Sequence, residues 1–217
     1  MASRLLHYLI ANQIIEDIKI DNKNRFLLGS LLPDLSSHDD RSYDKAHFWE
    51  RLTDKNIKGI NWLSYEKKYG IKMQVDSLYL GYYCHLIMDC LWFSLIVDPY
   101  VRKGSKSERA MLYQKGYHDY WRLNYILPRE YNLEYLLCVD EDINIEEIDC
   151  NQISNLADNL KMDIECKDYA CKEDMELYPY EIIEKYIKYA TEVCKKELFA
   201  FKNGERHMCP FEYYVAI

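Results

Sequence analysis

The stretch from Asp76 to Asp98 constrains the fold more than any other, and it reads DSLYLGYYCHLIMDCLWFSLIVD. Apolar residues surround almost every position, which is typical of one long helix buried on most sides. His85 and Asp89 lie four residues apart, so they share a helix face and point into the core together. A buried carboxylate is costly unless it is paired or binds a metal, and residues 78–97 contain no Lys or Arg. The positive charge must therefore come from elsewhere.

Two plainer interpretations of this stretch stay open. A run of about twenty apolar residues fits a membrane span. The ionisable pair in mid-segment and the lack of a flanking basic cluster speak against a span, so we expect none. The other interpretation is a buried His and Asp that hydrogen-bond only to each other, and the pair alone does not decide against it.

Length and composition favour a single all-α domain over residues 1–217. The chain has 49% hydrophobic residues, enough for one sizeable core, and no stretch of it resembles a linker. Only 7 Gly and 5 Pro are present, which together with the long periodic apolar stretches favours helices over a turn-rich β architecture. We expect a multi-helix bundle around a buried central helix at about 76–98.

The charge distribution narrows the range of partners. Between Val139 and Leu177 the chain carries 13 Asp and Glu against 3 Lys, a local balance of −10, while the whole chain has a net charge of −8. This argues against binding extended nucleic acid, which needs clustered Lys and Arg, and leaves small phosphate esters open. Whether the acidic segment 139–177 forms a lid over a cleft stays open, as does the oligomeric state.

The cysteines and the N-terminus favour a cytoplasmic protein. The eight cysteines form no C-x-x-C pair and no zinc-finger spacing, so we expect reduced thiols. The first residues, MASRLLHYLIANQ, lack the long apolar core and cleavage site of a signal peptide.

Further histidines and acids are expected to face the core. A first helix capped by Ser3 places His7 on its apolar side. Pro33 ends a second helix and holds Asp34 on a constrained turn. A polar loop then leads to His47, which aromatic residues follow, and loops often deliver ligands to a core in this way.

A later helix, expected from about 105 to 127, carries His118 and Arg122 on one face. Asp119 is turned about 100° away on the helical wheel. A surface histidine on a polar face is the alternative for His118, and the sequence leaves it open.

These inward-facing residues form one candidate set, which in chain order is His7, Asp34, His47, His85, Asp89 and His118. Imidazole nitrogen and carboxylate oxygen without thiolate suit catalytic Zn²⁺, or Mn²⁺ or Fe²⁺. Six ligands exceed the needs of one catalytic ion, whereas two ions roughly 3.5 to 4 Å apart would use them and activate water for phosphoester hydrolysis. Such ions would also compensate the buried carboxylate.

The same residues resemble those of the bacterial zinc-dependent phospholipase C family. The resemblance rests on His7, Pro33-Asp34, Ala46-His47-Phe48, Leu80-Gly81 before His85-x-x-x-Asp89, and Gly116-Tyr117-His118. It covers the chain from His7 to about Arg122 and implies an all-α fold, with a metal cluster at the base of a cleft that hydrolyses phosphodiesters. A phospholipid head group is one candidate substrate.

The resemblance also implies roles for single residues. One zinc would be bound by Asp34, His47, His85 and Asp89. His7 would bind a second zinc, which Asp89 bridges, and Asp34 would act as general base toward the metal-bound water.

The sequence departs from the family pattern at two places. Secreted members use the amino group and carbonyl of a processed first residue as ligands, whereas we expect this chain, as a distant cytoplasmic member, to offer no such terminus. A third zinc of the family uses an H-x-x-x-E element, but here the sequence reads His118-x-x-x-Arg122. We therefore expect His118 to complete a two-metal cluster, with Asp119 as the alternative ligand, and Arg122 to hold a phosphate oxygen.

The favoured hypothesis is thus a metal-dependent phosphoester hydrolase with two divalent ions, most simply zinc. A second hypothesis is an HD-type phosphohydrolase, suggested by His38-Asp39 and His118-Asp119. A third is a non-catalytic, metal-binding helical protein that binds a partner protein through some of its 21 tyrosines.

Overall fold

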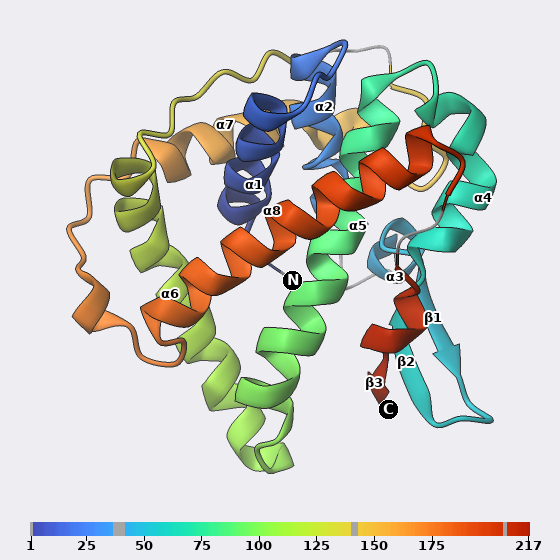
Figure 1. Cartoon of the computed structure of the whole chain (residues 1–217). Helices are drawn as coiled ribbons and strands as arrows, with labels where there is room; N and C mark the ends of the chain where they lie inside the picture. Colours follow the sequence, from blue (N-terminus) through green and yellow to red (C-terminus); the bar gives the residue numbers. More distant parts are fainter. Residues whose placement is uncertain (1, 37–41, 140–142, 206–207) are drawn as a thin grey trace.

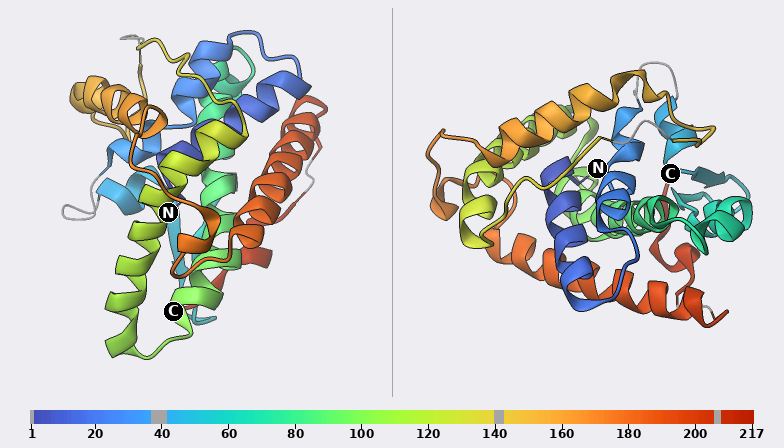
Figure 2. Two further views of the ribbon diagram at one scale, coloured as in Figure 1. Left: turned by 90° about the vertical axis from the view of Figure 1, so that its left-hand side faces the viewer. Right: turned by 90° about the horizontal axis from the view of Figure 1, so that it is seen from above.

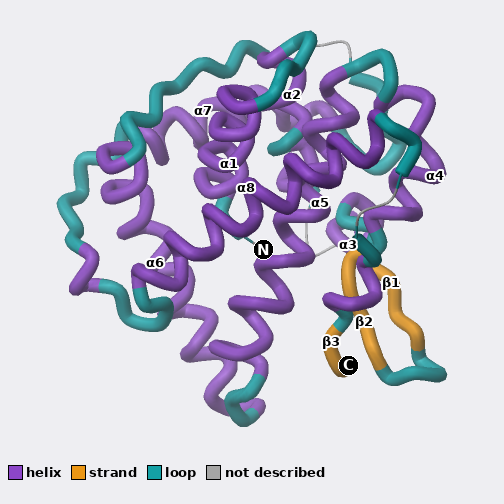
Figure 3. Tube along the Cα trace, viewed as in Figure 1, coloured by secondary structure: helices purple, strands orange, loops and turns teal. Residues whose placement is uncertain are grey.

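The computed structural model of the protein describes residues 2–36, 42–139, 143–205 and 208–217. The fold is all-α, with one small sheet at its edge (Figures 1 and 3). The helices are α1 (Arg4–Asp17), α2 (Lys23–Gly29), α3 (Ser42–Ala46), α4 (Trp62–Met73), α5 (Ser77–Trp92), α6 (Lys106–Glu130), α7 (Ile153–Ile164) and α8 (Tyr180–Lys202). The strands are β1 (Trp49–Leu52), β2 (Ile57–Ile60) and β3 (Val215–Ala216).

Helix α5 lies at the centre of the molecule, as the sequence predicts. All of its residues are buried, and α1, α2, α4 and α8 contact it (Figure 2). The segment Ser77–Arg102 is long and apolar enough to span a membrane, but 83% of its most apolar window is buried inside the protein. That burial is what a central core helix requires. All eight cysteines, each of which the structure describes, are free thiols.

The start of α5 is fixed to α2 by a cap and an ion pair. Asp76 Oδ1 accepts a hydrogen bond from the Leu78 backbone nitrogen at 2.9 Å. The Arg25 guanidinium donates to both carboxylate oxygens of Asp76, at 2.8 and 2.6 Å. This carboxylate therefore caps α5 and holds the first turns of α2 and α5 together.

Two glycines let the backbones of α2 and α5 touch. A Cβ atom on Gly29 would lie 1.9 Å from the Leu78 carbonyl oxygen, and one on Gly81 would lie 2.0 Å from the Phe26 carbonyl oxygen. No larger residue fits at either position without a shift of the backbone. The close approach brings α2 against the first turns of α5 and places Ser30, the residue after α2, beside His85.

Two helical segments continue past the ends that the sequence predicts at about residues 98 and 127. Beyond α5 the chain continues as a π-helix, Phe93–Arg102, which contains Pro99. Helix α6 likewise passes Pro128 and ends at Glu130. A proline near a helix end removes only one hydrogen bond, and Pro128 is buried.

The sheet was not foreseen from the sequence. Strands β1 and β2 form an antiparallel hairpin with Trp49 opposite Ile60 and Arg51 opposite Lys58, and β3 pairs with β2. Before the hairpin, α3 occupies most of the described part of what was expected to be an irregular polar loop. This helix ends one residue before His47.

Candidate metal centre

Five side chains from four parts of the chain meet beside α5: His7 (α1), Asp34 (a 3₁₀ turn, Leu32–Leu35), His47 (after α3), His85 and Asp89 (both α5). The three histidines are 0% exposed and Asp89 is 1% exposed. The carboxylate of Asp89 is their common neighbour. Its Oδ1 lies 3.2 Å from His7 Nε2, and its Oδ2 lies 3.3 Å from His47 Nε2 and 3.5 Å from His85 Nε2.

Backbone carbonyls fix the orientation of two of the rings. His85 Nδ1 lies 2.8 Å from the Ser30 carbonyl oxygen, and His47 Nδ1 lies 3.0 Å from the Tyr43 carbonyl oxygen. Because a carbonyl can only accept, both Nδ1 atoms carry the proton. In each neutral ring the Nε2 atom then holds a lone pair.

Three acceptor atoms consequently point at one place. His47 Nε2 and His85 Nε2 lie 3.2 Å apart, and Asp89 Oδ2 lies beside both. Two lone pairs and an anionic oxygen repel one another at these distances unless a cation lies among them. Either a protonated imidazole or a metal ion can supply that charge.

Several buried polar atoms of the cluster have no hydrogen-bond partner among the described residues. They are both ring nitrogens of His7, Asp34 Oδ1 and Asp89 Oδ2. Buried polar groups rarely stay unpaired, so this group of atoms needs an explanation. Two overlapping sets, His7–His85–Asp89 and Asp34–His47–His85, each have their ligand atoms within 4.8 Å of one another, close enough to hold a metal ion. The donor types and the unpaired atoms fit a metal centre.

The electrostatics favour the metal-binding forms of His7, His47 and Asp89, but they favour the protonated form of His85. Burial lowers the pKa of His7 and of His47, so both rings are neutral at pH 7. Burial opposes charge on His85 too, but the nearby carboxylates of Asp89 and Asp34 outweigh it and raise the pKa of this ring. Burial also opposes ionisation of Asp89, yet the surrounding histidines hold its pKa well below the usual range.

A cavity of about 490 Å³ opens onto the cluster at Asp34 and Asp89. One wall is a face of α6 that presents Tyr113, Gly116, Tyr117, Tyr120, Trp121 and Asn124. The opposite wall comes from the hairpin and the π-helix, with Trp49, Ile60 and Phe93. The cluster of candidate metal ligands thus lies at the base of an aromatic-lined cleft.

A sequence model of zinc-dependent phospholipase C matches residues 6–161. That span is most of the chain, and it contains all five clustered residues. The chain belongs to the zinc-dependent phospholipase C family. Comparisons with curated proteins and with solved structures gave no significant match. Family membership and the cluster together support a metal-dependent hydrolase that uses a divalent ion, most simply zinc.

The structure does not bring His118 to the five-residue cluster beside α5, contrary to our expectation. His118 Nδ1 lies 3.3 Å from Glu176 Oε1, and its side chain is 44% exposed. The ring packs on Trp121 with a centroid distance of 5.3 Å. Helix α6 turns its other face to the cavity, so the surface interpretation of this histidine is the one that the geometry supports.

Arg122 and Asp119 also serve a different purpose from the expected one. Arg122 donates to Glu176 Oε1 at 2.6 Å and to Asp119 Oδ1 at 3.1 Å. Asp119 accepts hydrogen bonds from the backbone nitrogens of Glu176, Leu177 and Tyr178, at 2.7 to 3.0 Å. Both side chains therefore fasten residues 176–178 to α6, and neither a metal-ligand role for Asp119 nor a phosphate role for Arg122 fits this arrangement.

These positions weaken the HD-type alternative. Its dipeptide His118-Asp119 lies apart from the cluster, with Asp119 fully occupied by backbone donors. The other dipeptide, His38-Asp39, lies outside the described residues.

Arg4 also lies in the cleft, although the sequence did not single it out. Arg4 Nε donates to Asp163 Oδ2 at 2.7 Å, and Asn124 donates to Asp163 Oδ1 at 2.8 Å. All three residues line the cavity. Arg4 is one helical turn before His7, and this spacing was the signal that could have found it.

The Ala2 backbone nitrogen is a second group at the site that the sequence did not single out. It donates a hydrogen bond to Asp89 Oδ1 at 2.9 Å, beside His7. The start of the chain therefore lies against the cluster, where the sequence analysis expected no contribution.

Proposed function

We propose that this protein is a phosphodiesterase that binds two divalent ions, most simply zinc, and uses them to hydrolyse a phosphate ester with water. The main support for this proposal is that His47 Nε2, His85 Nε2 and Asp89 Oδ2 converge on one buried point, at separations of 3.2 to 3.5 Å. The family match supports the hydrolase class.

The two oxygens of Asp89 suggest how the ions are shared. Oδ2 faces His47 and His85, so these side chains together with Asp34 would hold one ion. Oδ1 faces His7, so His7 and the second oxygen would hold the other, with Asp89 as the bridge. When bound, such ions act as Lewis acids and lower the pKa of a bound water.

Asp34 is placed to act as the general base. Its Oδ1 is buried and has no hydrogen-bond partner in the described part of the chain, and the residue lines the cavity. A carboxylate in this position can accept a proton from a water that attacks phosphorus. The base must lie within hydrogen-bond reach of that water. The cavity is open to water beside both Asp34 and Asp89.

Arg4 would orient the phosphate. Its Nε atom is held by Asp163, and the two terminal amino groups of the guanidinium have no hydrogen-bond partner among the described residues. Two parallel N–H donors match two phosphate oxygens. The aromatic walls would receive the organic part of the ester and exclude bulk water.

Ala2 offers a further ligand under one condition. As part of a peptide bond its nitrogen can only donate to Asp89 Oδ1. Removal of Met1 would leave an amino group at the same place, and a neutral amine can bind a metal. Intact-mass measurement of the purified protein tests whether this conversion occurs.

Hydrolysis of bis(4-nitrophenyl) phosphate by zinc-loaded protein tests the proposed function. We expect turnover that a chelator abolishes and added zinc restores, and that His47→Ala loses. The matched control is His118→Ala, which should keep activity because this ring contacts Glu176 instead. Activity that survives His85→Ala but is lost in folded Asp119→Asn would instead favour an HD-type enzyme.

The cavity distinguishes this proposal from a non-catalytic metal protein. A structural metal site is closed by four protein ligands, whereas a catalytic site keeps a position open. The cleft reaches Asp34 and Asp89 directly, which supports an open site.

A further inference from the structure

The β1–β2 hairpin places two positive charges directly opposite each other. Arg51 and Lys58 are cross-strand partners, an arrangement that weakens a strand pair. The pair Trp49 and Ile60 lies two positions along the same strands, so all four side chains share one face of the hairpin. Because Trp49 and Ile60 line the cavity, the two cations lie at its rim.

Phe93 joins this rim to a third cation. Its ring lines the cavity and packs edge-on against Trp49, with a centroid distance of 4.8 Å. Lys58 Nζ lies 5.9 Å from the Phe93 ring centroid, and the Arg102 guanidinium carbon lies 5.4 Å from it. Two cations thus converge on one aromatic ring at the mouth of the cleft.

Neighbouring acids pair with two of the three cations at this rim and leave Lys58 without an ion-pair partner among the described residues. Arg51 contacts Asp44 at 3.6 Å, but both side chains are more than half exposed, and such ion pairs are weak. Arg102 pairs with Asp98 at 2.9 Å and also donates to the Ala216 carbonyl oxygen, so it adds positive charge to the rim but has fewer free donors than Lys58. Lys58 has no ion-pair partner among the described residues.

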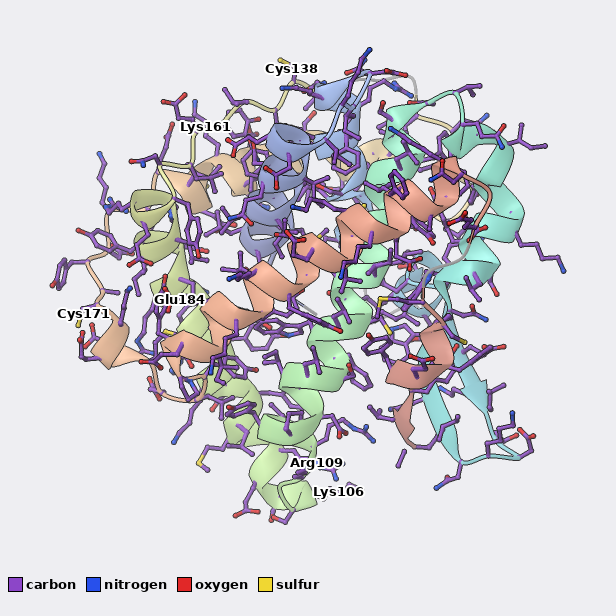
Figure 4. All side chains as sticks on the ribbon, viewed as in Figure 1. Lys106, Arg109, Cys138, Lys161, Cys171 and Glu184 are labelled. Carbon is purple, nitrogen blue, oxygen red and sulfur yellow. The ribbon has the colours of Figure 1, made fainter. Side chains whose placement is uncertain are left out.

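Further observations agree with this imbalance. Burial, together with the positive charges of Arg102, Arg51 and Arg109, lowers the pKa of Lys58. Arg109, labelled in Figure 4, lies at the same end of the molecule as the hairpin. A bound anion would relieve the repulsion among these groups.

We propose that Arg51, Lys58 and Arg102 form an anion subsite, which binds a second negatively charged group of the substrate, a phosphate or a carboxylate, away from the ester that is hydrolysed. The inference rests on the proposed function for the scissile group. The substrate would then carry at least two anionic groups. The part of the substrate that connects these groups would lie against Phe93 and Trp49.

Calorimetric titration of the zinc-loaded protein tests the subsite without turnover. The probes are a series of α,ω-alkanediol bisphosphates and the matching alkyl monophosphates. We expect at least one bisphosphate to bind about fivefold more tightly than its monophosphate. In Lys58→Met this preference should disappear while the monophosphate affinity stays unchanged. The control is Lys55→Met, an exposed lysine in the hairpin turn, which should keep the preference.

An unchanged preference in Lys58→Met would overturn the subsite. A second outcome would also overturn it. If Lys58→Met sediments less with vesicles of phosphatidylcholine containing one fifth phosphatidylglycerol while its bisphosphate affinity is unchanged, the rim is a membrane contact and not a substrate subsite. A protein that shows the expected preference but hydrolyses no ester would contradict the proposed function and leave the subsite supported.

Discussion

His47 and His85 face each other through Nε2 atoms that lie 3.2 Å apart, while the Nδ1 atom of each ring donates to a backbone carbonyl. The carbonyls of Tyr43 and Ser30 set both tautomers, so the lone pairs are directed at each other and at Asp89. Elements distant in the sequence hold this arrangement, which is unfavourable without a cation.

Asp89→Asn should remove bound metal while the protein stays folded. The substitution keeps the size of the side chain but removes the charge that three histidines surround. We expect zinc affinity to fall by at least about a hundredfold, measured by competition with a chromogenic chelator. Asp158→Asn, an exposed position on α7, is the matched control and should bind zinc like the wild type. Equal affinity in Asp89→Asn would show that this carboxylate is not a ligand.

Zinc affinity should fall as the pH is lowered, and His85 should be the first residue responsible. In the metal-free protein burial opposes its charge, but Asp89 and Asp34 prevail, so its pKa is raised above 6.5. Zinc must displace this proton, and below the raised pKa the affinity drops by up to about tenfold per pH unit. His7 and His47, with lowered pKa values, add to the slope only at lower pH. Chelator competition between pH 8 and pH 5.5 measures the slope, and a flat profile would contradict it.

Arg4→Met should impair hydrolysis more than Arg122→Met. Arg4 lines the cavity, whereas Arg122 is bound to Glu176 and Asp119. Loss of a charge-assisted contact to the phosphate should lower kcat/KM by about ten- to a hundredfold, and Arg4→Lys should recover part of it. Arg122→Met should keep kcat/KM and lose about 1 kcal/mol of stability. The reverse ranking would restore the assignment that the sequence suggested.

Gly81→Ala should destabilise the protein and weaken metal binding together. The added Cβ would meet the Phe26 carbonyl oxygen at 2.0 Å and push α2, which carries the chain to Ser30, away from α5. We expect a loss of about 1–3 kcal/mol or more in urea unfolding. Gly70→Ala is the control, because a Cβ there meets nothing within 4 Å, and it should stabilise α4 by about 1 kcal/mol. Equal stability of the two variants would argue against the close packing of α2 and α5.

The sequence was sufficient to predict the centre of this fold. A helix with apolar residues on all sides belongs in a protein core or a membrane, and the ionisable pair His85 and Asp89 favours the core and defines one face of the helix. The apolar side of the first helix and the proline turn gave His7 and Asp34 by the same local reasoning. Helical periodicity for His7, His85 and Asp89, the proline turn for Asp34 and the polar loop before aromatic residues for His47 together identified five side chains that the structure brings together.

Helix α6 shows where such reasoning fails. Its polar face, with His118 and Arg122, looked functional, whereas the cavity is lined by the face that presents Tyr117 and Trp121. Asp119 is satisfied by backbone nitrogens more than fifty positions away in the chain. Only the packing of distant segments decides which face of a helix meets the site, and a helical wheel does not contain that information.

The hairpin and Arg4 were missed for related reasons. Strands of four residues leave almost no periodic signal, and the cationic character of the hairpin arises from pairing Arg51 with Lys58. Arg4 looked like an ordinary residue of a first helical turn until α7 placed Asp163 beside it.

Anomalous diffraction at the zinc absorption edge, from crystals of the zinc-loaded protein, tests the central claim most directly. The account predicts two strong peaks, one next to His47, His85 and Asp89 Oδ2, and one next to His7 and Asp89 Oδ1. Absence of any peak among these side chains, with His47 and His85 still in contact, would show that a protonated histidine supplies the missing charge and would contradict the metal centre.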